Sequence, residues 1–223
     1  MKNVTVHLLT RGCTYLQPVV RALVPHVSKI LIAIDHRATL ETQIALDELA
    51  LAHRNLALYT VSIRNPFVDL VAARNMLVVH TETPYVWVVD DDELYQLETI
   101  RMVEKTLERN PDAKAFALKF WDVWNKEQAH RAYSNIWTVR LAKKTEKLYW
   151  KGVWGKECLY DGEERLARKE CAAVVQIPAR YIHLTRLKGK SLWREEMGQT
   201  RRPVVNPKMI PLPDDVRRMI CSL

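Results

Sequence analysis

Three consecutive carboxylates, Asp90, Asp91 and Asp92, follow directly after an apolar run at residues 85–89. Adjacent carboxylates repel one another unless a cation neutralises them. Their hard oxygen atoms suit Mg²⁺ or Mn²⁺, which bind through one or two carboxylates together with substrate phosphates. The alternative is a solvated acidic loop in which one carboxylate caps the next helix. The run therefore indicates either a metal and phosphate site or the start of a helix.

The elements that lead up to the acidic run alternate between two patterns. Short apolar runs at residues 4–9, 29–34, 56–63 and 85–89 predict strands, and helical spacing predicts helices at 16–24, 40–53, 67–80 and 93–109. This alternation predicts an α/β fold in which a mostly parallel central sheet carries helices on both faces. Ligands of such sheets bind beyond the carboxyl ends of the strands. Thr10, Arg11, Asp35 and the acidic run are expected there.

The second half of the chain has shorter and less regular elements. Strands are expected at residues 115–123, 136–141 and 172–177, an irregular segment at 149–164 and a short helix at 191–197. The stretch from 200 to 213 holds four of the ten prolines, which can neither pair in a central sheet nor continue a helix. With 223 residues, the chain is long enough for one substantial domain, and we expect a single one.

Composition and charge restrict where the chain acts and what it binds. No apolar stretch approaches the roughly 20 residues of a transmembrane helix. Four cysteines without metal-ligand spacing favour reduced thiols in a cytoplasmic protein, either free or peripheral to the inner membrane surface. Residues 1–100 hold 8 Lys and Arg against 11 Asp and Glu, whereas residues 101–223 hold 26 against 15. This positive excess either serves solubility alone or marks a surface for an anionic partner.

The sequence VAARNMLVVHTETPYVWVVDDDE at residues 71–93 combines a helix that carries an arginine, a strand and the acidic run. In this order and spacing it resembles the inverting family 2 glycosyltransferases of the GT-A fold, in which an AARN phrase precedes a strand and a D-x-D motif. Residues 4–23 resemble the first strand and helix of that family, and residues 29–42 resemble its second strand and the loop after it, so the resemblance covers residues 1–125. It implies a single GT-A domain at 1–223, with a nucleotide-sugar donor half at 1–110, an acceptor half at 111–200 and a Pro-rich tail at 201–223.

Within this resemblance, the acidic run becomes the metal and donor site. Asp92 would ligate Mn²⁺ or Mg²⁺ at the donor diphosphate, Asp90 would hold the ribose or assist the metal, and Asp91 would also lie against the donor. His183 resembles a late histidine that completes the metal or diphosphate site in many GT-A enzymes, although a lone histidine is more often structural. The resemblance therefore implies a metal held by Asp92, Asp90 and His183.

The remaining donor contacts implied by the resemblance come from the ends of the first two strands and from the AARN phrase. Asp35 matches the acidic position that contacts the nucleobase or ribose, and Arg74 matches the arginine beside the donor. Thr10 and Arg11 would contact the nucleotide. Each of these residues also has a plain structural interpretation: a loop aspartate, an ion pair on a helix surface and an ordinary strand-to-helix turn.

The acceptor side depends on residues 149–157, YWKGVWGKE, which resemble a W-x-G-x-x-H-E segment of the family. The match would make Glu157 the general base. Lys156 stands where the family usually has histidine, which leaves the register open and makes Asp161 a second candidate for the base. A surface carboxylate without a catalytic role is the alternative for Glu157.

These implications describe a metal-dependent glycosyltransferase of the hexosyltransferase type that transfers a sugar from a nucleotide-sugar donor, by default a UDP-sugar, with inversion. The basic second half favours an anionic acceptor, first a saccharide or lipid-linked one and alternatively a hydroxylated base of DNA. A non-catalytic nucleotide-sugar-binding module is the other alternative. A sugar nucleotidyltransferase is disfavoured, because the turn after the first strand has Gly12 alone instead of a glycine-rich loop.

Overall fold

The computed structural model describes residues 1–12, 14–130, 134, 136–153, 157–167, 173–184, 187 and 209–223. Within these residues, eight strands form a central sheet in the order β3-β2-β1-β4-β8-β6-β12-β5. The expected short helix at 191–197 lies outside the described residues. Among the described helices, none is long and apolar enough to cross a membrane.

The first half forms the parallel part of the sheet, as its alternating pattern predicted. Its strands are β1 (Val4–Thr10), β2 (Lys29–Asp35), β3 (Leu56–Val61) and β4 (Tyr85–Asp90). β1 lies between β2 and β4 and pairs in parallel with both. β1, β2 and β4 are almost wholly buried, and most of their side chains are apolar, with Thr5 and His7 as buried polar residues of β1.

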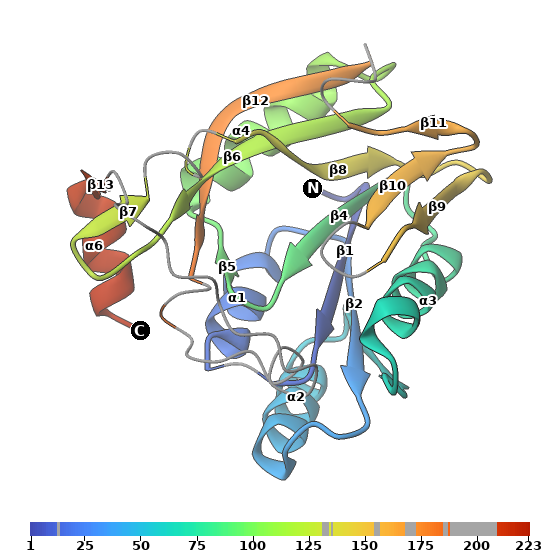
Figure 1. Cartoon of the computed structure of the whole chain (residues 1–223), viewed down its shortest axis with the longest axis horizontal. Coiled ribbons are helices and arrows are strands. Elements are labelled where there is room, and N and C mark those ends of the chain that lie inside the picture. Colours follow the sequence, from blue (N-terminus) through green and yellow to red (C-terminus); the bar gives the residue numbers. More distant parts are fainter. Residues whose placement is uncertain are drawn as a thin grey trace.

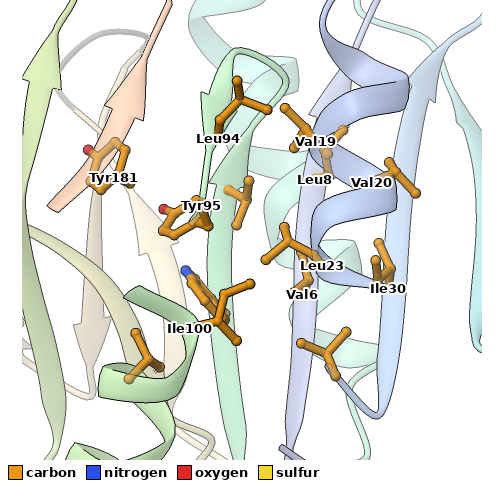
Figure 2. Packing of buried hydrophobic residues seen from close by; sticks show 14 of the residues in the cluster. Val6, Leu8, Val19, Val20, Leu23, Ile30, Leu94, Tyr95, Ile100 and Tyr181 are labelled. Atoms are coloured by element: carbon orange, nitrogen blue, oxygen red, sulfur yellow. The ribbon is translucent and has the colours of Figure 1, made fainter. Parts of the chain in front are cut away.

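Helices cover both faces of this part of the sheet. The first four are α1 (Leu16–Leu23), α2 (Leu40–Ala52), α3 (Pro66–Val79) and α4 (Leu97–Arg109). Apolar side chains of α1, α2 and α4 join one core cluster with Val6 and Leu8 of β1, and those of α3 join another cluster with Leu9 on the opposite face. Figure 1 shows α1 and α3 on either side of β1, and Figure 2 shows Val19, Val20 and Leu23 of α1 against β1 and β2.

The second half adds strands of mixed direction to the same sheet. β8 (Thr138–Lys143) pairs antiparallel with β4 and with β6 (Ala115–Asp122), and β12 (Val174–His183) runs parallel to β6. β12 is longer than the expected strand at 172–177 and continues to His183. β6 and β12 curve strongly, so that the end of β12 comes down beside β5 (Figure 1).

The segment after the acidic run differs from its expected helix. Glu93 and Leu94 form the short strand β5, which pairs with Ile182 and His183 of β12, and α4 begins only at Leu97. Tertiary pairing with β12 therefore overrides the local helical pattern at these two residues. The consequence for function is that the end of β12 is held directly against the acidic run.

Residues 149–164, expected to be irregular, instead contribute to a small antiparallel sheet. Its strands are β9 (Leu148–Lys151), β10 (Cys158–Asp161) and β11 (Glu164–Arg165). Trp150 and Leu159 pack with Val86 and Val88 of β4, on the face that α3 also covers. Gly162 forms the turn between β10 and β11 with φ of 62°, which a residue with a side chain rarely adopts.

Part of the Pro-rich tail is described, and it lies outside the central sheet as predicted. β13 (Met209–Pro211) pairs with β7 (Gln128–His130), and α6 (Asp214–Cys221) follows. Val216 and Ile220 of α6 belong to the main core cluster. The described end of the chain is therefore packed against the second half.

Candidate functional site

The carboxyl ends of β1, β2, β4 and β12 meet at one region of the sheet. Leu9 pairs with Asp90, and Thr10 pairs with Ile34, so the ends of the three parallel strands are level. On the other side, His183 at the end of β12 pairs with Glu93. The topology therefore gathers polar residues that lie far apart in the sequence.

Asp90 is held by two arginines. Arg74 of α3 donates from Nη2 to Oδ1 at 3.0 Å, and Arg140 of β8 donates from Nη2 to Oδ2 at 3.2 Å. Burial by itself would raise the pKa of Asp90, but the positive charges of Arg140 and Arg74 outweigh it and hold that pKa well below its usual range. Asp90 is therefore an ionised carboxylate with a guanidinium group on each oxygen.

Glu93 is a further buried carboxylate close to Asp90, and the sequence patterns did not single it out. It forms a close ion pair with Arg140, accepts a hydrogen bond from the Tyr95 hydroxyl at 3.1 Å and another from the Asp90 backbone N–H at 3.3 Å. Burial raises its pKa to about 7, against the opposing charge of Arg140. Arg140 is also fixed from behind, because its Nε donates to the Tyr181 hydroxyl at 3.1 Å.

Asp91, which the resemblance placed against the donor, is bound to the end of β1. The Thr10 hydroxyl donates to Asp91 Oδ2 at 2.7 Å and accepts a hydrogen bond from the Gly12 backbone N–H at 2.9 Å. Both Thr10 and Asp91 are buried. The pair therefore ties the acidic loop to the end of β1.

Asp92 faces His183. The distance from Asp92 Oδ2 to His183 Nε2 is 3.9 Å, and the backbone carbonyl of Asp92 accepts a hydrogen bond from Leu184 N at 2.8 Å. On the far side of the ring, His183 Nδ1 lies 3.3 Å from Asp122 Oδ1. Burial would lower the pKa of His183, but the Asp122 hydrogen bond and the Asp92 charge outweigh it and raise that pKa.

The donor set at Asp92 and His183 fits a divalent cation that also binds a ligand. Metal–ligand distances near 2.0–2.2 Å allow one ion to contact two atoms that lie 3.9 Å apart. Among the described residues, no group of three or more His, Cys, Asp or Glu side chains converges as a metal site. The remaining ligands would then be water and substrate phosphate, which is how Mg²⁺ is usually bound.

Asp35 lies at the end of β2 and is fully buried. Arg37 covers it, donating from Nη2 to Oδ2 at 3.0 Å and from its backbone N–H to Oδ1 at 3.1 Å. His36 Nδ1 lies 3.1 Å from Oδ1, and Arg11 Nε lies 3.9 Å from Oδ2. The carboxylate of Asp35 therefore holds Arg11 and Arg37 in place, and these cations stand nearer to the surface than Asp35 does.

A pocket opens on the Asp90 side of the acidic run, between β4, β8 and the small sheet. Its volume is ≈ 340 Å³, which is within the usual size of ligand sites. The residues that carry charged or aromatic groups into its lining are Arg74, Asp90, Trp137, Arg140, Trp150 and Glu157. Arg74 also places its guanidinium over the Trp150 ring, 4.8 Å from the centroid.

The pocket lining has hydrogen-bonding capacity that the described part of the chain does not use. Arg74 Nε, Trp150 Nε1 and Glu157 Oε2 are buried atoms without a hydrogen-bond partner. Because buried polar atoms are normally paired, two donors and one acceptor around one pocket suit a ligand rich in hydroxyl groups.

The structure separates the two candidates for the general base. Glu157 lines the pocket that contains Asp90. Asp161 lies at the other end of β10, where it accepts a hydrogen bond from the Thr145 hydroxyl at 2.6 Å and lies 3.5 Å from Lys114 Nζ. Glu157 is therefore brought to the candidate site, and Asp161 is engaged elsewhere.

Comparison with known proteins shows similarity to solved structures but no match by sequence. No known protein family and no curated protein sequence matches this chain. The solved structure of S. aureus TarS 1–349 is similar with 12% identity over 81% of this chain and 60% of that one, at a TM-score of 0.55. A mannosyltransferase, PcManGT from Pyrobaculum calidifontis in complex with GDP-Man and Mn²⁺, is similar with 15% identity over 90% of this chain and 66% of that one, at a TM-score of 0.54.

TarS 1–349 in complex with UDP is also similar, with 12% identity over 81% of this chain and a TM-score of 0.53. This chain spans 60% of the length of these TarS structures. At such low identity the likeness shows the fold alone. The chain has the α/β GT-A fold, with a large curled and mostly parallel central sheet, as the sequence predicted.

Proposed function

We propose that this chain is a glycosyltransferase of the hexosyltransferase type that uses a nucleotide-sugar donor, in the first instance a UDP-sugar. The observation that carries the proposal is the division of the acidic run at the end of β4. Asp90 lines the pocket together with Arg74 and Arg140, which both bind its carboxylate. Asp92, by contrast, faces His183. A donor diphosphate bound at the acidic run would place its sugar in the pocket beside Asp90 and the cation beside Asp92 and His183. The structural neighbours with bound UDP or GDP-Man support this assignment.

The proposed cation is Mn²⁺ or Mg²⁺, held by Asp92 and His183. When bound, it would stabilise the negative charge that develops on the departing diphosphate. Asp90, which the resemblance offered as a ribose or metal contact, is assigned to the donor side, because both of its oxygens are already bound by arginines. The Mn²⁺ in the mannosyltransferase complex is consistent with a cation of this kind.

The nucleotide is assigned to the ends of β1 and β2. Arg11 and Arg37 are the cations there, and Asp35 orients both of them. Thr10 and Asp91 hold the loop between this area and Asp92. The donor would therefore run from β2 across β1 to the end of β4, which is the ligand-binding edge of sheets of this class.

The chemical step requires a base beside the sugar, and Glu157 is the proposed base. Its carboxylate would take the proton of an acceptor hydroxyl. The hydroxyl oxygen would form a bond to the anomeric carbon while the bond from that carbon to the diphosphate oxygen breaks. The electron pair of the broken bond leaves with the diphosphate. A single displacement of this kind inverts the anomeric configuration.

The acceptor is proposed to be anionic, with a saccharide or lipid-linked molecule as the first choice. The reason is the net charge of residues 101–223, which hold 26 Lys and Arg against 15 Asp and Glu. Hydroxylated bases of DNA are the second choice. Duplex DNA binding measured between about 50 and 200 mM salt decides between them, because phosphate contacts weaken steeply over that range. If duplex DNA does not bind even at low salt, the second choice is wrong.

The proposal is tested by incubating the purified chain with UDP-, GDP- and dTDP-sugars and Mn²⁺ and measuring donor hydrolysis or transfer. Asp92→Ala is expected to abolish metal-dependent turnover. Glu108→Gln is the matched control, because Glu108 is exposed and lies beside Met1 and Pro111, near the amino ends of β1 and β4 and away from the acidic run. Turnover by Asp92→Ala at the wild-type rate in EDTA would contradict the metal assignment. A wild-type chain that neither binds nor turns over any of these donors would contradict the function.

A further inference from the structure

We infer that Asp122 is a positioning residue that orients His183 for binding a divalent cation beside Asp92. The inference rests on the proposed function, because it concerns the metal of that same site. Asp122 has no counterpart in the motifs that pointed to the site. Its carboxylate lies 3.3 Å from His183 Nδ1, and His183 Nε2 lies on the side of Asp92, 3.9 Å from Oδ2.

The backbone keeps Asp122 and His183 side by side. They are the last residues of β6 and β12, and they are direct partners in the parallel pairing of those strands. The pairing continues one residue further, because Val123 N donates to the His183 carbonyl at 3.1 Å. The backbone N–H of Asp122 donates to the buried Ser134 hydroxyl at 3.1 Å. The two side chains are therefore set by strand register.

The chemistry of the contact decides which ring nitrogen can bind a metal. An ionised carboxylate only accepts hydrogen bonds, so the imidazole must carry a proton on Nδ1 to bind Asp122. In the neutral ring this leaves the lone pair on Nε2, the nitrogen that faces Asp92. Metal-bound histidines commonly donate their second N–H to a carboxylate in this way, and that partner tunes the affinity.

The surroundings of the ring limit its other orientations. The Phe120 ring meets the His183 ring edge-on, with centroids 5.3 Å apart and an interplanar angle of 78°. Asp122 is only 5% exposed, so solvent has little access to the carboxylate that His183 contacts. His183 thus lies between two carboxylates, Asp122 at the end of β6 on the Nδ1 side of the ring and Asp92 in the turn between β4 and β5 on the Nε2 side.

Mn²⁺ affinity in the presence of UDP tests the inference without requiring turnover. Asp122→Asn keeps the shape of the side chain, but its amide can donate a hydrogen bond to Nδ1 and so favour the tautomer whose lone pair faces away from Asp92. We expect the Mn²⁺ dissociation constant to rise by about 10- to 100-fold. Asp122→Ala removes the carboxylate without offering a donor and should weaken Mn²⁺ binding less than Asp122→Asn does. Glu108→Gln is the control with unchanged affinity.

The outcomes separate the inference from the proposed function. If Asp92→Ala and His183→Ala lose Mn²⁺ binding and both folded Asp122 variants bind like the wild type, Asp122 has no positioning role and the metal site stands. If the wild type with UDP binds no Mn²⁺, the metal site and the inference are both wrong. If circular dichroism shows that Asp122→Asn is not folded, the Mn²⁺ affinity of Asp122→Ala alone decides whether Asp122 has a positioning role. A purely structural Asp122 would lower the unfolding temperature of the variants without changing their Mn²⁺ affinity.

Discussion

The side-chain amide of Asn75 pairs with both backbone polar groups of Trp150. Asn75 Nδ2 donates to the Trp150 carbonyl at 3.0 Å, and Asn75 Oδ1 accepts from the Trp150 N–H at 2.6 Å. Asn75 follows Arg74 on α3, and the Arg74 guanidinium lies over the ring of that same tryptophan. The AARN phrase therefore connects the first half of the chain to the small sheet and sets one wall of the pocket.

We predict that Asn75→Ala lowers the free energy of unfolding by about 2 kcal/mol, because it leaves two backbone groups of Trp150 without partners. Asn75→Asp retains the acceptor for the Trp150 N–H, but it sets a second carboxylate oxygen against the Trp150 carbonyl oxygen, so it should also be less stable than the wild type. Urea unfolding of the three proteins measures the difference. Equal stability of Asn75→Ala and the wild type would show that water replaces the amide without cost.

Arg140 and Glu93 provide a second prediction, because each neutralises the other inside the protein. Arg140→Met leaves Glu93 buried without its cation, and removing one partner of a buried ion pair typically costs about 3–5 kcal/mol. The double variant Arg140→Met with Glu93→Gln removes both charges, and it should be more stable than Arg140→Met alone. A double-mutant cycle by urea unfolding measures this coupling. Additive effects of the two substitutions would contradict it.

The sequence predicted the parts of the fold in which local pattern and tertiary structure agree. β1, β2 and β4 are short apolar runs buried on both faces, and such runs can be recognised without knowledge of their neighbours. The small sheet was missed because β9, β10 and β11 have two to four residues each, too few for an alternating pattern to stand out. The start of α4 was misplaced because Leu94 pairs with Ile182, a contact between distant parts of the chain.

The same distinction applies to the candidate site. Asp90 and Asp92 belong to one short motif at the end of β4, and His183 was added to the predicted site by the family resemblance. Roles for Arg140, Glu93 and Asp122 were not predicted, because each of them acts through contact with a residue on another strand, far away in the sequence. Arg140 could have been singled out from the pattern TVRLAK of its strand, because a charged residue within a central strand needs a buried partner of opposite charge.

His7 predicts how stability depends on pH. Burial, together with the charges of Arg74 and Lys144, lowers the pKa of His7 from 6.5 to about 3, so the folded chain keeps this imidazole neutral. The unfolded chain binds a proton near pH 6.5, and protonation therefore favours unfolding as the pH falls from 6.5 toward 3. His7 contributes most to stability above pH 6.5, and about 1.4 kcal/mol of that contribution should be lost at pH 5.5.

His7→Gln tests this assignment, because it removes the titrating group. Urea unfolding at pH 8 and at pH 5.5 should show a smaller loss of stability for the variant than for the wild type. Other titrating groups contribute equally to both proteins, so the comparison isolates His7. An identical pH dependence of the two proteins would show that His7 is protonated in the folded state or reaches solvent.

The last prediction concerns the general base, for which Glu157 and Asp161 offer a matched pair of substitutions. Glu157 lines the pocket with Asp90, and its Oε2 has no hydrogen-bond partner in the described part of the chain. Asp161 is bound by Thr145 and lies beside Lys114. Under the proposed function, a carboxylate in the pocket can reach an acceptor hydroxyl, whereas one held at the far end of β10 acts through stability alone.

Glu157→Gln is therefore expected to lower kcat for sugar transfer by about 10²- to 10⁴-fold, the usual contribution of a general base, with little change in donor affinity. Asp161→Asn should retain kcat and lower the unfolding temperature, because it weakens the contacts with Thr145 and Lys114. Steady-state kinetics and thermal unfolding of both variants measure the two effects separately. The donor UDP-sugar and Mn²⁺ are kept saturating, so that a change in binding is not mistaken for a change in chemistry. The reverse result, with kcat lost in Asp161→Asn and retained in Glu157→Gln, would move the base to the other end of β10 and would mean that the acceptor approaches from outside the pocket.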